Sequence, residues 1–195
     1  MLAFAQVAES AVCVGFGQSS STCVGGTTDY IGNVTGVTFS SGSTPPANRV
    51  FVQLFTATCA GSCTTGTLNT ASIYETAVAY SADKTVKVCV YSDNGDGVAN
   101  SGDTLISCSD PITQDTGGNA GWRTNTGLSG TVTCGSNYWV AYTANTVAQP
   151  TIGYKVDTIT SYYQSITNAF ASPPANLGGT WTGVTRNQGV GVDIR

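Results

Sequence analysis

The chain has 195 residues, of which 41% are hydrophobic and only 9% are charged, and its formal net charge is −4. This length suits one domain, or one domain with an additional segment, and it can bury a sizeable core. Seven scattered basic residues argue against nucleic acid, which requires a clustered basic face, and no apolar run approaches the ~20 residues of a membrane span.

Residues 1–28 differ in composition from the rest of the chain. They contain no Lys or Arg, and they hold Cys13 and Cys23, each followed by Val-Gly. With so few charges, the segment would lose little solvation free energy when buried against another surface. We interpret residues 1–28 as an N-terminal arm or added edge strand and residues 29–195 as the main domain.

Short runs of β-branched and aromatic residues then recur between turns rich in Gly, Ser, Asn and Pro, a pattern typical of many short strands. The predicted strands are residues 30–39, 50–58, 71–80, 85–91, 104–108, 138–143, 151–156 and 190–194. Alternating valines predict one buried face for residues 85–91, whereas residues 138–143 are apolar on both faces, as in a central strand. Residues 162–171 fit either a short helix or a corner between strands. The sequence therefore predicts an all-β fold, an antiparallel, jelly-roll-like β-sandwich with the N-terminal arm, stapled by disulfides.

Seven cysteines in a chain without histidine indicate disulfides rather than a zinc site, which usually has CxxC pairs or His ligands. This cysteine usage predicts a secreted protein located outside the cell or on its surface. The predicted bridges are Cys59–Cys63, across a short turn, Cys89–Cys108, near the base of a hairpin, and Cys13–Cys23. Cys134 is then left as a free or intermolecular thiol, although spacing alone leaves other pairings open.

The loop at residues 92–103 resembles a calcium loop in its spacing of oxygen-bearing residues. Asn94 and Asp96 occupy positions three and five, the Val98 carbonyl position seven, and Asp103 position twelve. Ser92 stands at position one, and the carboxylate of Asp93 is shifted by one residue. The predicted metal ligands are Asp93, Asn94, Asp96, Val98 and Asp103, with calcium as the only candidate cofactor. The alternative is a polar hairpin loop whose Asn-Gly and Asp-Gly pairs supply the turn.

Enzyme mechanisms find little support in the sequence. Without His, the chain has neither a Ser-His-Asp nor a Cys-His arrangement. A glycosidase pair could come from the eleven carboxylates, but five of these lie in one loop-rich stretch: Asp93, Asp96, Asp103, Asp110 and Asp115. The sequence therefore predicts a protein that is not an enzyme.

Two further features concern carbohydrate. Trp122, Trp139 and Trp181, together with nine tyrosines, permit stacking on sugars, although aromatic residues in strands more often fill a core. Asn33-Val34-Thr35 is the only N-glycosylation sequon.

Several short motifs from about residue 68 onward, over about two thirds of the chain, follow a familiar order. VCVYSDNG at 88–95 leads to GDTLI at 102–106, AGW at 120–122 and YWVAY at 138–142, before Gly153-Tyr154 and Pro173-Pro174. This order resembles β-sandwich modules of secreted bacterial and archaeal surface proteins, whose strands read Y-S-D-N-G, G-W and Y-W-L-A-Y. The resemblance implies a non-catalytic, jelly-roll-like domain that displays, adheres or assembles. The cysteines and residues 1–28 depart from that pattern and suggest a cross-linked version.

These features together favour a structural subunit of an extracellular filament, pilus-like fibre or surface layer. In this interpretation the protein is its own partner, and the arm adds a strand to a neighbouring copy. A secreted carbohydrate-binding or adhesive module is the alternative, and a hydrolase has only the acidic loop in its favour.

Overall fold

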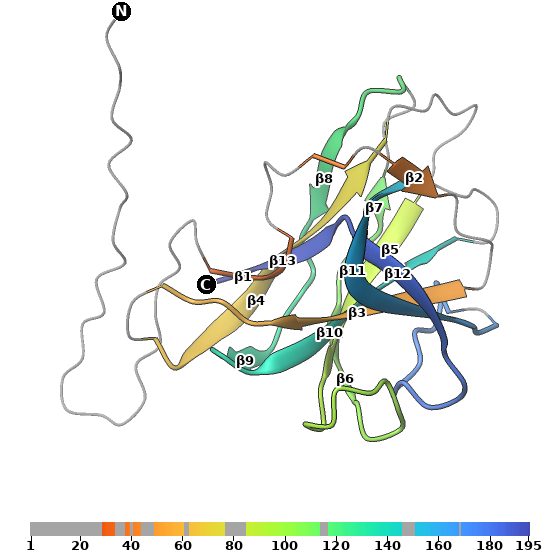
Figure 1. Ribbon diagram of the computed structural model, residues 1–195. Coiled ribbons are helices and arrows are strands. Elements are labelled where there is room, and N and C mark those ends of the chain that lie inside the picture. Colours follow the sequence, from red (N-terminus) through yellow and green to blue (C-terminus); the bar gives the residue numbers. More distant parts are fainter. Residues whose placement is uncertain are drawn as a thin grey trace, which may run out of the picture.

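The computed structural model describes residues 29–33, 38–39, 41–43, 49–60, 63–76, 85–113, 117–145, 151–167 and 169–195. Every regular element in this part is a β-strand, which confirms the predicted all-β class (Figure 1). The predicted arm at residues 1–28 lies outside the described residues. The strands are β1 (Tyr30–Gly32), β2 (Ser41–Ser43), β3 (Arg49–Thr56), β4 (Thr65–Glu75), β5 (Thr85–Ser92), β6 (Leu105–Cys108), β7 (Ile112–Thr113), β8 (Gly121–Asn125), β9 (Thr131–Thr133), β10 (Asn137–Ala144), β11 (Ile152–Ser165), β12 (Thr182–Gln188) and β13 (Val190–Ile194).

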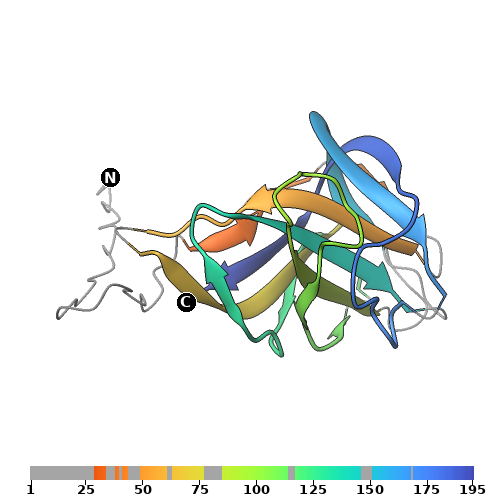
Figure 2. The same ribbon diagram turned by 90° about the horizontal axis from the view of Figure 1, so that it is seen from below.

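These strands join one antiparallel sheet of thirteen strands, in the main order β1-β13-β4-β11-β3-β10-β5-β6. Off this path, β2 and β12 pair with β11, β7 with β5, and β8 and β9 with β4. Strands distant in sequence lie side by side, as β3 and β10 do along their whole length (Figures 1 and 2). At one end of the order, Tyr30 of β1 also bridges to Thr58, just beyond β3, so the sheet curls back toward its middle. The described strands thus form one continuous sheet, and the sandwich stays a prediction.

The larger apolar cluster follows the period-two alternation of the strands on one face of the sheet. β5 contributes its alternating valines, and β10 contributes Tyr138, Val140 and Tyr142, all of which are buried. Side chains of β4 and β13 pack into the same cluster although these strands are far from β5 in the sheet order. The sheet therefore folds over this face and encloses the main core.

The opposite face of β3, β5 and β10 buries a second cluster, which includes the fully buried Tyr91 and Trp139. Part of the connection between β11 and β12, residues 169–181, covers this face, and we call it the cap segment. Leu177 of the cap segment is buried in the cluster, and Trp181 packs against it while its Nε1 donates a hydrogen bond to the Leu177 carbonyl at 2.8 Å. A stretch without regular structure thus closes the second core.

This second cluster corrects the expectation of one buried face for residues 85–91. In β5, Cys89 and Tyr91 are buried as well as the valines. The Tyr91 hydroxyl donates a hydrogen bond to the Pro174 carbonyl of the cap segment at 3.0 Å, and burial raises the pKa of this phenol well above its ordinary value. Lys87 suggested that this face of the strand is exposed to solvent. The cap segment that covers the face has no strand periodicity, so the sequence gives no sign of the cover.

Among the other elements, the local sequence pattern predicts some correctly and misses others. The central strand predicted at residues 138–143 is confirmed by β10, which is buried on both faces. The helix alternative for residues 162–171 is wrong, because β11 continues to Ser165 and the described residues that follow form turns. β9 and β12 were not predicted, since their Thr- and Gly-rich sequences lack an apolar alternation.

Candidate functional site

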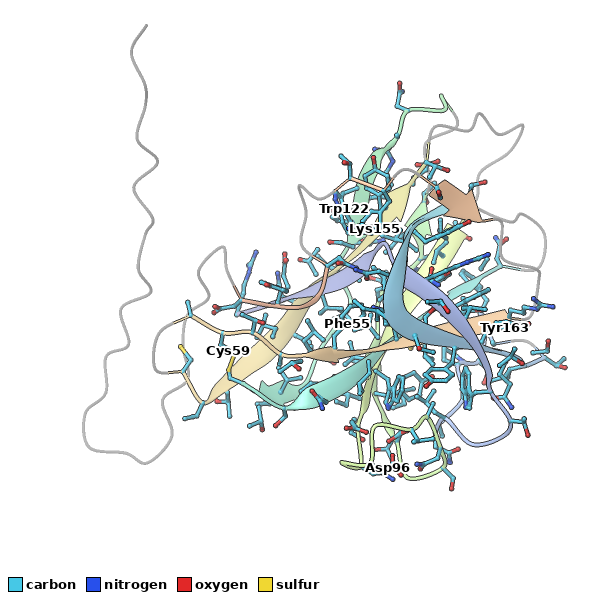
Figure 3. All side chains as sticks on the ribbon, in the orientation of Figure 1. Phe55, Cys59, Asp96, Trp122, Lys155 and Tyr163 are labelled. Carbon is cyan, nitrogen blue, oxygen red and sulfur yellow. A yellow bond between two sulfur atoms is a disulfide. The ribbon has the colours of Figure 1, made fainter. Side chains whose placement is uncertain are left out.

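The loop at residues 92–103 joins β5 to β6 and projects from the sheet, with Asp96 near its outer end (Figure 3). Ser92 and Thr104 close its base, because the Ser92 amide donates to the Thr104 carbonyl at 2.9 Å and the Thr104 amide to Ser92 Oγ at 3.0 Å. Cys89 and Cys108 occupy paired positions of the two strands and form a disulfide, with their Cα atoms 4.0 Å apart. The hairpin and the disulfide across it are those that the sequence predicts.

Asp103 organises this loop from the inside. Its side chain is fully buried, and its two carboxylate oxygens accept hydrogen bonds from the backbone amides of Asn94 at 2.9 Å and Asn100 at 2.8 Å. Two N–H donors offset the cost of burying this carboxylate. The Asp103 carbonyl also accepts a hydrogen bond from the Leu177 amide at 3.1 Å, which joins the loop to the cap segment.

Asn100 is a central residue of the loop that the sequence analysis did not identify. Its Nδ2 donates to Asp96 Oδ2 at 2.7 Å and to the Val98 carbonyl at 2.8 Å, and its Oδ1 accepts from Asn94 Nδ2 at 3.2 Å. Asn100 stands at position nine of the calcium-loop register, a position that contributes a ligand, often through water. That spacing is the signal by which it could have been found.

The predicted ligands therefore fall into two groups. Asn94, Asp96, Val98 and Asp103 all contact Asn100, so four of the five meet inside the loop. The fifth, Asp93, instead accepts a hydrogen bond from the Gly97 amide at 3.2 Å and stabilises the turn.

This loop can bind a hard cation only through a mixture of carboxylate, amide and carbonyl oxygens. Among the described residues, no group of three or more His, Cys, Asp or Glu side chains is arranged to hold a metal ion. A cation would therefore depend on amide and carbonyl oxygens, which calcium accepts. The Asn100 side-chain amide donates to both Asp96 Oδ2 and the Val98 carbonyl oxygen, and a cation could be coordinated by the same two oxygens. Calcium binding stays a prediction.

The longer disulfide corrects the predicted cysteine pairing. Cys59 bonds to Cys134 across a sequence separation of 75 residues, so Cys134 is not a free thiol and Cys59 does not pair with Cys63. The register of β3 and β10 explains this pairing, because Thr56 lies opposite Asn137 in an antiparallel ladder. Three residues beyond Thr56 the chain reaches Cys59, and three residues before Asn137 it reaches Cys134. Spacing along the chain does not reveal this register.

Cys63 is disulfide-bonded as well. The other four described cysteines bond to one another, so none of the described cysteines is a free thiol. The two remaining cysteines of the sequence, Cys13 and Cys23, lie outside the described residues, and so does the bridge predicted between them.

The tryptophans pack against the protein rather than displaying their rings. Trp139 is fully buried, and Trp122 meets Tyr74 and Phe39 edge-on, with ring centroids 5.6 and 5.9 Å apart. Trp181 lies against the second cluster. In the described part of the chain, no aromatic side chain is largely exposed. Stacking on sugar requires an exposed ring face, and Trp122 and Trp181 are half-buried, so carbohydrate binding stays a prediction.

Asn33, the predicted glycosylation site, uses its side chain inside the fold. Its Nδ2 donates hydrogen bonds to Asn187 Oδ1 at 2.9 Å and to the Gln188 carbonyl. This nitrogen is the atom to which an N-linked glycan would be attached. A glycan replaces one of the two hydrogens on this nitrogen, so a glycosylated Asn33 could keep at most one of these contacts in the folded chain.

A buried polar cluster joins four strands, and sequence reasoning missed it. The Gln188 amide donates to Gln53 Oε1 at 2.8 Å, and Gln188 Nε2 donates to Ser161 Oγ at 2.9 Å. The Tyr142 hydroxyl donates to Gln188 Oε1 at 3.0 Å, and burial raises the pKa of this phenol well above its ordinary value. Because each buried polar group needs a partner, these bonds favour one register of β3, β10, β11 and β12 over others.

No protein-family model matches the chain, and no curated protein matches it. No helix in the described part of the chain is long and apolar enough to cross a membrane. What the geometry defines is an all-β domain with disulfides, the kind of cross-link that persists in oxidising compartments.

Proposed function

We propose that the protein is a structural subunit of an extracellular filament, pilus-like fibre or surface layer, and that copies assemble through residues 1–28. The cysteine count is the observation that carries this proposal. Of the seven cysteines, four form the two described bridges, and Cys63 is also bonded, with Cys13 and Cys23 as the cysteines left for it. In this proposal a bond from Cys63 to residues 1–28 takes the place of the predicted Cys13–Cys23 bridge, and the cysteine that remains over is available for a bond to another copy.

The surface supports close packing between copies. Charged residues make up 9% of the chain, and the only large apolar side chains exposed among the described residues are Val98 and Ile159. A neutral, polar surface gives little electrostatic repulsion between identical subunits. The resemblance to surface modules of secreted proteins points in the same direction.

The proposal includes no catalytic activity. The chain has no His, and two carboxylates of its most acidic stretch, Asp93 and Asp103, accept backbone hydrogen bonds within their own loop. These bonds give the acidic loop a structural role that needs no reaction.

The covalent part of this assembly can be tested with single cysteine variants of the full-length chain. The wild type should form disulfide-linked multimers on gels without reductant and filaments or sheets in electron micrographs. Of Cys13→Ser and Cys23→Ser, only one should abolish the covalent link, because the other cysteine pairs with Cys63. Ser20→Ala, in the same segment, is the matched control and should assemble as the wild type does.

A wild type that remains monomeric at all concentrations, with one titratable thiol, would contradict the proposal. Deletion of residues 1–28 separately tests the non-covalent contribution, provided that circular dichroism shows the β-fold retained. Unchanged assembly of the truncated chain would assign the contact to another surface.

We also propose that the 92–103 loop binds calcium through Asn94, Asp96, Asp103 and the Val98 carbonyl, with Asp93 and Asn100 in support. A ligand at about 100 times its dissociation constant stabilises the folded state by ~2.7 kcal/mol. Calcium should therefore raise the melting temperature of the wild type but not that of Asp96→Asn. Asp110→Asn, an exposed carboxylate outside the loop, is the control and should respond as the wild type does. No shift in the wild type at millimolar calcium would exclude this role.

A carbohydrate-binding or adhesive module is the second candidate function. The tryptophans and tyrosines suggested it, but their packed rings favour a structural role for the described ones. Binding of the full-length protein to a glycan array, with loss of that binding in Trp122→Ala, would revive this candidate.

A further inference from the structure

Asn94-Gly95 is the only Asn-Gly pair in the chain, and it lies at the exposed end of the 92–103 loop. Gly95 has a φ of +96°, and a Cβ built on it would meet no heavy atom within 4 Å. The space beside the Gly95 Cα is therefore open, and glycine has no side chain that hinders its peptide nitrogen. In an Asn-Gly pair this nitrogen can close a five-membered ring on the Asn side-chain carbonyl carbon.

Hydrogen bonds fix the orientation of the Asn94 side chain. Asn94 Oδ1 accepts a hydrogen bond from the Asp96 amide at 3.1 Å, which forms an Asx turn and bends the side chain back over the following backbone. A donor on Oδ1 also stabilises negative charge that develops there when a nucleophile attacks Cγ. Nδ2, the group that would leave, donates to Asn100 Oδ1 at 3.2 Å.

We propose that Asn94 is a site of spontaneous deamidation in the folded protein. The Gly95 nitrogen attacks Cγ of Asn94, a new C–N bond forms, the Cγ–Nδ2 bond breaks, and Nδ2 leaves as ammonia with the proton lost by Gly95. Water then opens the resulting cyclic imide at either carbonyl and leaves aspartate or isoaspartate at position 94. Water is the only co-reactant, and nothing is oxidised or reduced.

Both products change the loop. Aspartate adds a carboxylate at position three of the calcium-loop register, and calcium affinity rises with ligand charge. Isoaspartate inserts Cβ into the main chain after Cα of residue 94, which changes the turn that Asn94 Oδ1 makes with the Asp96 amide. The effect on calcium rests on the proposed calcium role, whereas the modification itself does not depend on it.

The experiment incubates freshly purified full-length protein at mildly alkaline pH and follows residues 88–123, which trypsin releases between Lys87 and Arg123. After reduction and alkylation, this peptide should gain with time the mass difference between an amide and a carboxylic acid. Fragmentation should locate the gain at Asn94, and an isoaspartate methyltransferase should label the product. Asn100 and Asn119 in the same peptide are followed by Ser and Ala, so they serve as internal controls.

Two glycine variants separate the proposed attack from a general loosening of the loop. Gly95→Ala adds a methyl group next to the attacking nitrogen and should slow the modification several-fold. Gly97→Ala strains the same loop at another glycine of positive φ but leaves Asn-Gly intact, so it should react at the wild-type rate. Acid formation at Asn94 no faster than at Asn100 and Asn119, or equal rates in the two variants, would overturn the proposal. Neither result bears on assembly, which is measured with fresh protein.

Discussion

Removing the bridge between Cys59 and Cys134 should cost more stability than removing the one between Cys89 and Cys108. A disulfide stabilises a protein largely by restricting its unfolded chain, and this effect grows with the logarithm of the loop that it closes. The sequence separations are 75 and 19 residues. The entropy relation then gives about 4.5 kcal/mol for the longer bridge and about 3.2 kcal/mol for the shorter. The free energy of unfolding of a domain is ~5–15 kcal/mol, so either loss is a large part of the total stability.

The assay is urea unfolding of two double variants, Cys59→Ser with Cys134→Ser and Cys89→Ser with Cys108→Ser. Both cysteines of a bridge are replaced, so neither variant leaves an unpaired member of that bridge to exchange with Cys63. The first double variant should lose ~1 kcal/mol more of the free energy of unfolding than the second. A first variant as stable as the wild type would refute the entropy argument. A Cys59–Cys63 bridge in a peptide map of oxidised wild type would refute the register argument.

Three other substitutions test particular contacts. Asp103→Ala leaves two backbone amides without their acceptor and should lower the free energy of unfolding by ~1–3 kcal/mol, measured by urea unfolding. Tyr142→Phe removes the donor to Gln188 and should cost ~1–2 kcal/mol at neutral pH. Because folding raises the pKa of this phenol above 10.0, the wild type loses stability as pH rises above that value, and the variant should lose less in urea unfolding at each pH. Gly153→Ala places a Cβ 2.6 Å from Cδ1 of Tyr74 and should cost ~1–3 kcal/mol. Gly183→Ala, whose Cβ would meet nothing closer than 3.5 Å, should melt at nearly the wild-type temperature.

The features that the sequence predicts correctly are local ones. The hairpin of β5 and β6 could be predicted because its valine alternation, its turn residues and its two cysteines all lie within one short stretch. The Cys59–Cys134 bridge could not, because it depends on the register of β3 with β10, two strands that are far apart in the sequence. β12 was missed for a related reason. Its polar residues become a strand through pairing with β11 rather than through their own pattern.

The same division applies to the candidate site. The spacing of the oxygen-bearing residues in the 92–103 loop predicts the candidate ligands. The same spacing could also have identified Asn100. The buried cluster around Gln188 could not be predicted, because the polar sequence of β12 gives no sign of the partners of this glutamine. Gln53 and Tyr142 reach it from other strands, and only the folded sheet brings them together.

Tryptophan fluorescence can report a partial opening of the cap segment. Trp139 lies in the cluster beneath it and Trp181, its last residue, packs against that cluster, whereas Trp122 lies in the separate aromatic group with Phe39 and Tyr74. Two of the three fluorophores therefore respond to water that enters under the cap segment. Irregular segments with few backbone pairings open at lower free energy than the strands that they cover. A red shift of tryptophan emission at denaturant concentrations that leave the far-ultraviolet circular dichroism unchanged would reveal this opening as a step separate from unfolding of the sheet.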